Sequence, residues 1–334
     1  MASIIQLAND LKLSKGTVSR ILNDATAPYN AKTRHRVLTR AAEMGYHPNP
    51  VARALATGRT DTVALWTRHL QNFYQSWVIN SLSRQTAAGS FNLLIRLYGQ
   101  YGPTISSPAS DSVARPFVLS DSVDGVITHG VPPDEWLARF RGGSRPVPIV
   151  VTGGVPSPEI PDFVGLELCT AARAAVEHLV GMGLRRIALF ALPNPEDRRN
   201  QAYISVMEAA GLPQECIPLR EGTRTETRRQ FREYVTACGH PEAVFCHNDD
   251  TAIAVYRALC DLGLRVPDDV ALVGCDGIED TEFLPVPITT IVQPVEEMSR
   301  IAWEFLQRRL QEPDAPPQQH VLEARLEIRA SSQK

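Results

Sequence analysis

The sequence of 334 residues lacks features that define several other classes of protein. It contains no run of about 18 apolar residues, which a membrane-spanning helix needs. Its first residues lack the basic segment, apolar stretch and small-residue cleavage site of a secretory signal, so we expect a cytoplasmic location, as for a bacterial nucleoid-associated protein, and no membrane partner. The six cysteines include no CxxC pair. We expect them to be reduced, buried, small apolar residues rather than disulfides or zinc ligands.

Motifs of common enzymes are also missing. A nicotinamide-dependent enzyme carries a glycine fingerprint after a strand, whereas GMGLRR precedes a predicted strand. Cys246 and His247 have no further ligands at the spacing of a metal site. No nucleophile, base and orienting residue are indicated by spacing. We therefore expect no enzyme activity, no cofactor and no bound metal.

The charge of the chain is distributed unevenly. Hydrophobic residues make up 43% and charged residues 21%, which is ordinary for a globular chain long enough for two or three domains. Residues 1–59 hold nine Lys or Arg against three Asp or Glu, a charge of +6, although the whole chain carries −3. A basic head on an acidic body is typical of a nucleic-acid-binding module joined to a body that does not contact nucleic acid.

Three short helices are predicted in this head. Ser3 and Gln6 form a capping-box pattern ahead of the first helix, and Ser14 caps the second. The third begins at Asn30 or Thr33. Two helices joined by a tight turn and followed by a third predict a helix-turn-helix module. The apolar faces are Ile4, Leu7, Ala8 and Leu11; Val18, Ile21 and Leu22; and Val37, Leu38, Ala41 and Met44.

The second helix of such a module reads base edges in the major groove. Lys15 and Arg20 can donate to guanine, so they are the candidates for base contacts. Hydroxyl side chains suit phosphates, and Gly16 has no side chain, which narrows the base-reading surface to about two residues. The alternative is a solvated amphipathic helix. The predicted DNA-contacting residues of this helix are Ser14, Lys15, Gly16, Thr17, Ser19, Arg20 and Asn23.

Several stretches resemble the lactose/galactose repressor (LacI/GalR) family of bacterial transcription regulators. The resemblance covers essentially the whole chain, in the order of the family. It implies a homodimer that binds a pseudo-palindromic operator in double-stranded DNA, with an affinity set by a small-molecule effector. Members respond to inducers or to corepressors, so the sign of the response stays open, as do the operator and the regulated genes. The matching stretches are LSKGTVSRILN, NAKTRHRVLTRAAEMGYHPNPVARALATGRTDTVAL, SVDGVITHG, AVEHLVGMGLRRIALF, FCHNDDTAIAVYRALCDLGLRVPDDVALVGCDG and PITTIVQP.

The segment NPVARALATG predicts a short helix after the head. Asn49 can cap it with Pro50 at its first position, but eight residues are too few to hold a helix alone. In the family this is the hinge helix, which enters the minor groove. The resemblance places Leu55 as the apolar wedge at a central base step and Ala52 against the groove floor. Asn49 is also among the predicted DNA-contacting residues. The alternative is a flexible linker.

The body predicts two α/β halves with parallel, doubly wound sheets, because strand-like runs alternate with helical patterns. The resemblance implies a periplasmic-binding-protein-like core of two lobes. The chain is expected to cross from one lobe to the other near residues 161, 291 and 321. The fold class is therefore an all-α helix-turn-helix head joined to an α/β core. The expected divisions are a DNA-binding domain at 1–48, a hinge at 49–59 and a core at 60–334, with a first lobe of about 60–161 and 292–321 and a second of about 162–290 and 322–334.

Ligands of open α/β sheets bind beyond the carboxyl ends of the strands. Asn248 and Asp276 each follow a predicted strand, whereas we expect Asp249 to cap the next helix. The resemblance makes Arg199 an effector contact through the pattern R-x-x-G-aromatic, here with Ala in place of Gly. Phe73 stands where the family has an aromatic pair and is expected to form an apolar wall for a sugar-like ring, with a place in the core as the alternative.

The effector class rests on departures from the family. Arg224 stands where an aromatic residue often lines the cleft, and Gly153 where a polar residue often meets a sugar hydroxyl. We expect a carbohydrate-like effector, with a sugar acid or phosphosugar bound by Arg199 and Arg224 as one form. The alternative is that Arg224 pairs with Glu226 or Glu221 on the surface. Two further alternatives are an effector of nucleoside or purine type and, in a different class, a solute-binding protein.

Overall fold

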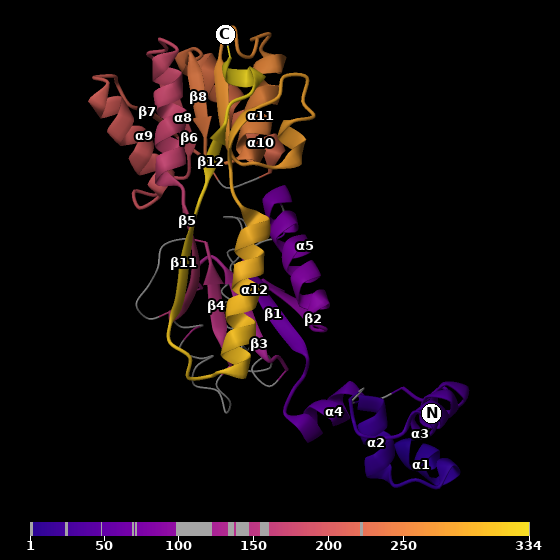
Figure 1. The fold of residues 1–334 in the computed structure, drawn as a ribbon. Helices are drawn as coiled ribbons and strands as arrows, with labels where there is room; N and C mark the ends of the chain where they lie inside the picture. The colour runs from indigo at the N-terminus through magenta and orange to yellow at the C-terminus, as the bar shows by residue number, and fades with distance from the viewer. Residues whose placement is uncertain are drawn as a thin grey trace, which may run out of the picture. The chain divides into compact units, whose positions relative to one another are not determined.

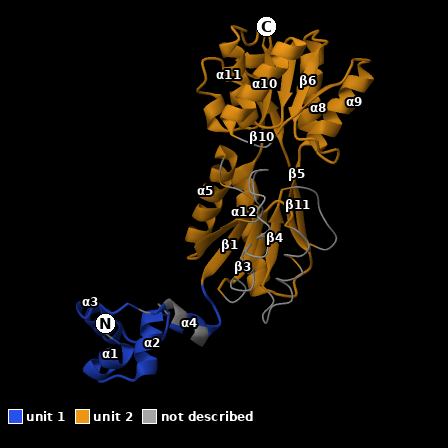
Figure 2. Ribbon diagram, turned by 180° about the vertical axis from the view of Figure 1, so that it is seen from behind, with its two compact units in different colours: residues 1–60 blue, residues 61–334 orange. Residues whose placement is uncertain are grey.

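The computed structural model describes residues 3–23, 26–47, 49–68, 70, 72–97, 122–132, 137, 147–153, 160–220 and 223–333. The chain forms two compact units, residues 1–60 and residues 61–334, which Figure 2 colours separately. Within the described ranges, no helix has the length and apolar character needed to cross a membrane.

The first unit is built from the three predicted helices, α1 (Ile4–Leu11), α2 (Lys15–Asn23) and α3 (Ala31–Glu43). The capping box at the start of α1 is confirmed. Leu7, Val18 and Val37 are fully buried and join the three helices in one core. The prediction was wrong for Leu38, whose side chain is 47% exposed. Successive residues of a helix lie about 100° apart, so Leu38 turns away when Val37 and Ala41 face inward.

The turn between α1 and α2 contains a left-handed residue that is not glycine. Lys12 has φ 54° and ψ 41°, and its backbone N–H donates to the carbonyls of Ala8 and Asn9 at the end of α1. Ser14 then caps α2, because its hydroxyl accepts from the backbone N–H of Thr17 at 3.0 Å. Lys12 carries the steric cost that glycine would avoid at this position, since its side chain has to adopt a left-handed backbone.

A fourth helix, α4 (Pro50–Thr57), ends the first unit. The Asn49 side chain accepts from the backbone N–H of Ala52 at 3.4 Å. Gly58 follows the helix with φ 70°, the left-handed conformation that commonly ends helices at glycine. The segment is therefore helical, as predicted.

The second unit contains two sheets. In the described residues the first has the strand order β11-β5-β4-β3-β1-β2, and all its strands are parallel. Two helices, α5 (Phe73–Ala88) and α12 (Val295–Gln311), lie side by side over one face of this sheet (Figure 1). We call this sheet with α5 and α12 the first lobe. Its strands are β1 (Thr62–Thr67), β2 (Asn92–Leu97), β3 (Gly125–His129), β4 (Ile149–Thr152), β5 (Asp162–Glu167) and β11 (Gln318–Glu323).

The second sheet has the order β12-β10-β9-β8-β6-β7, with only the edge strand β12 antiparallel among the described strands. Along β6 (Ile187–Ala191), Leu189 faces one apolar cluster and Phe190 the other, so the sheet is buried on both faces. We call this sheet and its helices the second lobe. The other strands are β7 (Glu215–Pro218), β8 (Ala243–Cys246), β9 (Ala271–Asp276), β10 (Thr289–Val292) and β12 (Arg325–Glu327); helices α8 (Cys169–Gly181) and α9 (Arg198–Ala209) cover one face, and α10 (Arg224–Cys238) and α11 (Asp249–Asp261) the other.

The chain passes between the lobes three times. The first passage follows Glu167, because β5 belongs to the first sheet. The prediction of a crossing and a lobe boundary near residue 161 was therefore wrong. Gly165 interrupts the apolar run of β5. The sequence pattern therefore does not indicate this strand, although its Phe163 and Val164 are fully buried. The second passage follows β10, and the third lies between Glu323 and Arg325, slightly beyond the expected residue 321.

The six cysteines are free thiols. Cys246 and Cys275 are buried, as expected, at the ends of adjacent strands. The expectation of burial was wrong for Cys216, Cys238 and Cys260, which are exposed.

Candidate functional site

A cavity of about 740 Å³ lies between the two lobes of the second unit. It is found where parallel strands of both sheets end, which is where ligands of open α/β sheets bind. Residues at or directly after the ends of strands form much of its wall. They are Gly153 after β4, Leu192 after β6, His247 and Asn248 after β8, and Gln293 after β10; His129 and Asp276 are the last residues of β3 and β9.

Arg199 lies at the floor of this cleft, near the start of α9. Its guanidinium forms a bidentate ion pair with Asp197, with Nη2 2.7 Å from Oδ2 and Nε 3.0 Å from Oδ1. The two side chains are only 14% and 13% exposed. Burial raises the pKa of Asp197, but the hydrogen bonds and charge of Arg199 outweigh it and hold that pKa at about 2. The pair is therefore fully ionised, and its net charge is zero.

Asp276 also lies in the cleft wall, held in an unusual backbone conformation. Its φ is 135°, in the region that favours glycine, and its carboxylate accepts from Nε2 of Gln293 at 2.8 Å. The hydroxyl of Tyr74, from α5 in the other lobe, donates to Oε1 of Gln293 at 2.8 Å. Burial and the negative charge of Asp249 raise the pKa of Asp276 well above its usual range. This chain of contacts links the two lobes across the back of the cleft.

Asn248, not Asp249, caps α11. The Asn248 side chain accepts from the backbone N–H of Thr251 at 2.9 Å, and Asn248 also lines the cavity. Asp249 is buried behind the cavity wall and accepts from the backbone N–H groups of Gly277 and Ile278 at 2.7 and 2.9 Å. The prediction that Asp249 caps the helix was wrong, because its carboxylate turns back to hold the loop after β9.

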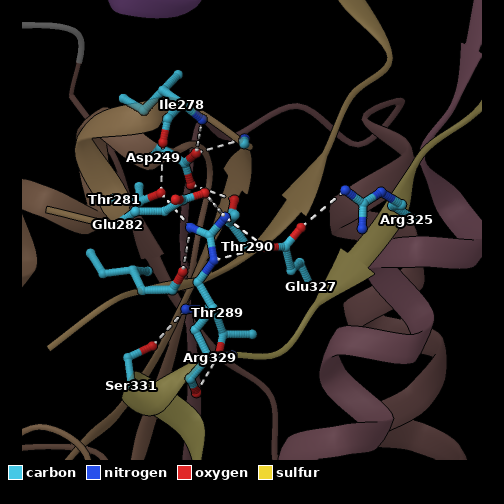
Figure 3. A network of polar contacts seen from close by, with 12 residues as sticks. Asp249, Ile278, Thr281, Glu282, Thr289, Thr290, Arg325, Glu327, Arg329 and Ser331 are labelled. Carbon is cyan, nitrogen blue, oxygen red and sulfur yellow. Dashed lines mark hydrogen bonds and ion pairs between the residues drawn. The ribbon is translucent and has the colours of Figure 1, made fainter.

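Figure 3 shows the polar network that surrounds Asp249. The hydroxyl of Thr290 donates to the Asp249 carboxylate at 2.6 Å. Burial raises the pKa of Asp249 to about 6, although the hydrogen bonds from Thr290 and the backbone oppose it. Arg329 lies in the same network, where its guanidinium pairs with Glu327 at 2.9 Å and Glu282 at 2.8 Å. The network fixes the loop that follows Asp276 to the last strand and tail of the second lobe.

Arg224 lies at the mouth of the cleft, at the first residue of α10. Its Nε donates to Asp250 at 2.6 Å, and Nη1 lies 3.9 Å from Asp280. The guanidinium carbon is 5.1 Å from the centroid of the Phe73 ring, which belongs to the other lobe and is 51% exposed. This distance is typical of a cation–π contact. Phe73 is therefore a cleft residue rather than part of the core.

Arg224 pairs with Asp250 and not with Glu226, one of the two predicted surface partners. Glu226 completes the capping box of α10 by accepting from the backbone N–H of Thr223 at 2.7 Å, and Glu221 lies outside the described residues. The prediction of a cationic cleft is not supported either. Arg199 and Arg224 each already have a carboxylate partner, Asp197 and Asp250.

Several residues of the cavity wall were not predicted. Gln293 and His129 could have been found from the rule that identified Asn248, since they follow or end strands. Asn72 and Gln75, at the start of α5, carry no comparable signal in the sequence. The five predicted cleft residues, Phe73, Arg199, Arg224, Asn248 and Asp276, all line the cavity.

The first unit presents the predicted DNA-contacting residues on α2. Lys15, Gly16 and Arg20 are exposed, whereas Thr17 and Ser19 are half-buried. The Ser14 hydroxyl hydrogen-bonds to the Thr17 hydroxyl at 2.9 Å as well as capping the helix. These hydroxyls stabilise the helix start, and the cationic side chains beside them remain at the surface.

The remaining predicted contacts lie at the end of α2 and on α4. The Asn23 amide donates to the backbone carbonyl of Ser19 at 2.9 Å, so it stabilises the last turn of α2. Ala52 is exposed on α4, beside the capping residue Asn49. The side chain of Leu55 lies outside the described residues. Among the residues that the structure does describe, no group of three or more His, Cys, Asp or Glu side chains could hold a metal ion.

Comparison with known proteins links both units to regulators of transcription. Residues 176–332 match the family of periplasmic binding protein-like domains. The HTH-type transcriptional regulator CelR of Thermobifida fusca is 30% identical over 337 aligned residues, which cover 96% of this chain and 95% of that protein.

Two solved structures are similar over the whole chain. A complex of the transcriptional regulator CelR with cellobiose has a TM-score of 0.68 at 27% identity, covering 99% of this chain and 100% of that one. The Lac repressor dimer bound to operator and the anti-inducer ONPF has a TM-score of 0.82 at 22% identity, covering 100% and 99%. The predicted fold class, a helix-turn-helix head joined to a periplasmic-binding-protein-like core, is confirmed.

Proposed function

The chain belongs to the lactose/galactose repressor (LacI/GalR) family of transcriptional regulators, and from this premise we propose that an uncharged saccharide in its cleft controls its affinity for a DNA operator. The observation that carries the effector class is that Arg199 and Arg224 are each paired with a carboxylate, Asp197 and Asp250, while the third arginine of the lining, Arg220, is exposed at its rim. A sugar acid or phosphosugar would need free cationic donors. An uncharged saccharide needs neutral donors and acceptors beside an apolar wall.

The cleft offers those groups. Asn248, Gln293 and His129 line it with amide and imidazole groups, and the half-exposed ring of Phe73 offers an apolar face. The CelR regulator of the similar structure is in complex with cellobiose. A regulatory role also fits the lack of a nucleophile, base and orienting residue in the sequence, so we propose that ligand binding here leads to a change in DNA affinity and not to catalysis.

The DNA-binding part of the proposal rests on α2 and α4. Lys15 and Arg20 are exposed on the helix that follows the tight turn, so we propose that they read base edges in the major groove. We propose that Ser14, Thr17 and Ser19 face phosphates. For α4 we propose the minor groove, with Leu55 inserted as a wedge. We propose that two copies of the chain place two heads on a pseudo-palindromic operator; the similar Lac repressor structure is a dimer bound to operator.

The experiment that tests this proposal has two parts, both with the full chain. A random DNA library is selected on the protein, and the enriched sequence is titrated with wild type, Arg20→Ala and the control Arg229→Ala, which removes an exposed arginine of α10. Loss of a base contact costs about 1–3 kcal/mol, so Arg20→Ala should weaken specific binding about 10- to 100-fold and the control should not. Failure to enrich any sequence would reject DNA regulation.

In the second part, melting temperatures are measured with uncharged saccharides, cellobiose and lactose among them, and with sugar acids and phosphosugars. A ligand that binds only the folded state raises the melting temperature. We expect an uncharged saccharide to raise it and to change operator affinity. Stabilisation by acids alone would overturn the effector class but leave the DNA-binding proposal intact.

A further inference from the structure

The chain enters the second unit at a residue with a left-handed backbone. Asp61 is the first residue of this unit and has φ 47°. Residues other than glycine adopt this conformation at a cost in free energy, although aspartate tolerates it better than most. A costly conformation persists only where the surrounding structure holds it. The contacts of Asp61 therefore bear on the hinge segment, residues 49–59, which precedes it in the chain.

Asp61 is held at both of its backbone polar groups. Its N–H donates to the carboxylate of Asp124 at 2.9 Å. Its carbonyl accepts from the backbone N–H of Asn92 at 2.8 Å and from the side-chain amide of Asn92 at 3.3 Å. Asn92 begins β2, and Asp124 directly precedes β3; these are the two strands that flank β1 in the sheet. Asp61 is therefore fixed from both sides of the strand into which it leads.

The side chain of Asp124 extends the hold of the sheet by one residue toward the hinge segment. Its backbone N–H donates to the carbonyl of Thr62, the first residue of β1, at 2.7 Å. Its carboxylate reaches one residue further, to Asp61. Asp124 is fully buried, and a buried carboxylate is costly unless hydrogen bonds satisfy it. An apolar residue would fill this place without that cost, so the acid indicates a role beyond packing.

Helix α12 packs against the backbone next to Asp124. Gly125 has no side chain, and a Cβ at this position would lie only 2.7 Å from Cδ1 of Leu306. Leu306 is fully buried near the end of α12, the helix that follows the second passage between the lobes. The place where Asp61 is held is thus in contact with an element that leads directly from the second lobe.

We infer that Asp124 and Asn92 are positioning residues for the hinge segment, because they limit the conformations open to Asp61. This inference rests on the proposed function and deepens it. If Asp61 were free, the joint would behave as a flexible linker, and a change in the first lobe would be lost there. With Asp61 fixed, such a change alters the conformations available to α4, which is the coupling that regulation by an effector requires.

The first test is limited digestion of the full chain with trypsin, which cleaves after Arg59, two residues before Asp61. Mass spectrometry gives this cleavage rate relative to the rate after Arg229, an exposed residue of α10. Cleavage of a transiently opened segment follows the population of the open form. Asp124→Ala should raise the relative rate about tenfold, because a charge-assisted hydrogen bond is lost, and Asn92→Ala should raise it about threefold.

Two further variants serve as controls for the digestion. Asp124→Asn keeps an oxygen that can accept from Asp61, so its relative rate should stay within about twofold of wild type. Asp268→Ala removes an exposed acid that pairs with Arg265 in the second lobe, and it should change nothing.

The second test compares the affinity for the duplex enriched by the library selection with the affinity for a scrambled duplex. Asp124→Ala should lower the ratio of the two affinities about tenfold, because only specific binding requires the proposed placement of α4 in the minor groove. Asp124→Asn should restore the ratio. A purely structural role would lower the melting temperature of the folded chain but leave this ratio unchanged.

Unchanged digestion after Arg59 in both Asp124→Ala and Asn92→Ala would overturn the inference. Faster digestion with an unchanged affinity ratio would overturn it too, since the hold on Asp61 would then have no effect on α4. If Asp124→Ala does not fold, Asn92→Ala, at an exposed position, decides alone. If the selection enriches no duplex, the proposed function fails while digestion still tests the hold on Asp61, so the two failures are distinguishable.

Discussion

The floor and the mouth of the cleft each hold an Arg–Asp ion pair, but the two pairs differ in burial. At the floor, the Arg199 and Asp197 side chains are 14% and 13% exposed. At the mouth, Arg224 is 38% exposed, and its guanidinium packs on an aromatic ring of the opposite lobe. The chemistry is the same in both places. The surroundings make the floor pair a fixed part of the fold and the mouth pair a contact that can rearrange.

This difference follows from the cost of an unpaired charge. Removing one partner of a buried ion pair leaves the other charge without solvent, which costs about 3–5 kcal/mol. A partly exposed pair is screened by water and contributes about 0–1 kcal/mol. The floor pair is therefore expected to matter more for the stability of the fold than the mouth pair.

The largest effect is expected from breaking the floor pair. Asp197→Ala should lower the free energy of unfolding of the second unit by about 3 kcal/mol, since Arg199 stays buried without its carboxylate. The matched change at the mouth, Asp250→Ala, should cost less than about 1 kcal/mol. Urea denaturation of the full chain, followed by circular dichroism, measures both. Equal losses would remove the distinction between floor and mouth.

An intermediate effect is expected from acid. The pKa of His247 is about 3 in the folded chain, below the ordinary value of 6.5, because of burial and the nearby Arg199. The unfolded chain therefore binds a proton between these values that the folded chain does not. Stability is fully present above pH 6.5 and falls as the pH drops toward 3, by up to about 1.4 kcal/mol per unit.

His247→Gln should remove this contribution, so its unfolding free energy should depend less on pH between 4 and 6.5 than that of wild type. The comparison of the two chains cancels the titration of other groups. His320→Gln, at an exposed histidine of β11, is the control and should keep the wild-type slope. If the free energy of unfolding changed with pH equally in wild type and His247→Gln, protonation of His247 would not destabilise the folded chain.

The smallest effect on stability is expected at the mouth. Phe73→Ala removes an exposed ring and its cation–π contact with Arg224, so the unfolding free energy should fall by no more than about 1 kcal/mol. The affinity for the saccharide that stabilises the wild type should fall more clearly, by about tenfold, because the apolar wall is lost. Calorimetric titration measures the affinity. A large loss of stability with unchanged affinity would place Phe73 in the structural core.

The sequence predicts local structure well where short-range signals agree. The capping box at Ser3 and the cap at Ser14 each depend on residues three positions apart. Apolar runs predicted seven of the twelve described strands; β5, β7, β10, β11 and β12 were missed, and in β5 the pattern is broken by Gly165. Local rules thus fail where the fully buried strand contains a small residue.

The cleft was predicted less completely because its contacts join distant segments. The residues that line it were identified from strand ends and from the family resemblance. Their partners were not, since Arg224 pairs with Asp250 rather than with a neighbour in sequence. Asp249 turned away from the helix cap for the same reason, because its acceptor atoms serve a loop 28 residues later. Spacing in the sequence indicates which residues lie near the cleft, but not which of them form ion pairs with one another.

Because the chain passes between the lobes three times, the two lobes become complete at different points of synthesis. Helix α12 covers apolar residues of strands β1, β3, β4 and β5, which are synthesised more than a hundred residues earlier. The second lobe lacks only its edge strand β12 and the short tail once β10 has been made. A nascent chain paused before residue 295 therefore holds a second lobe that is nearly complete and a first lobe whose apolar face is still open to chaperones.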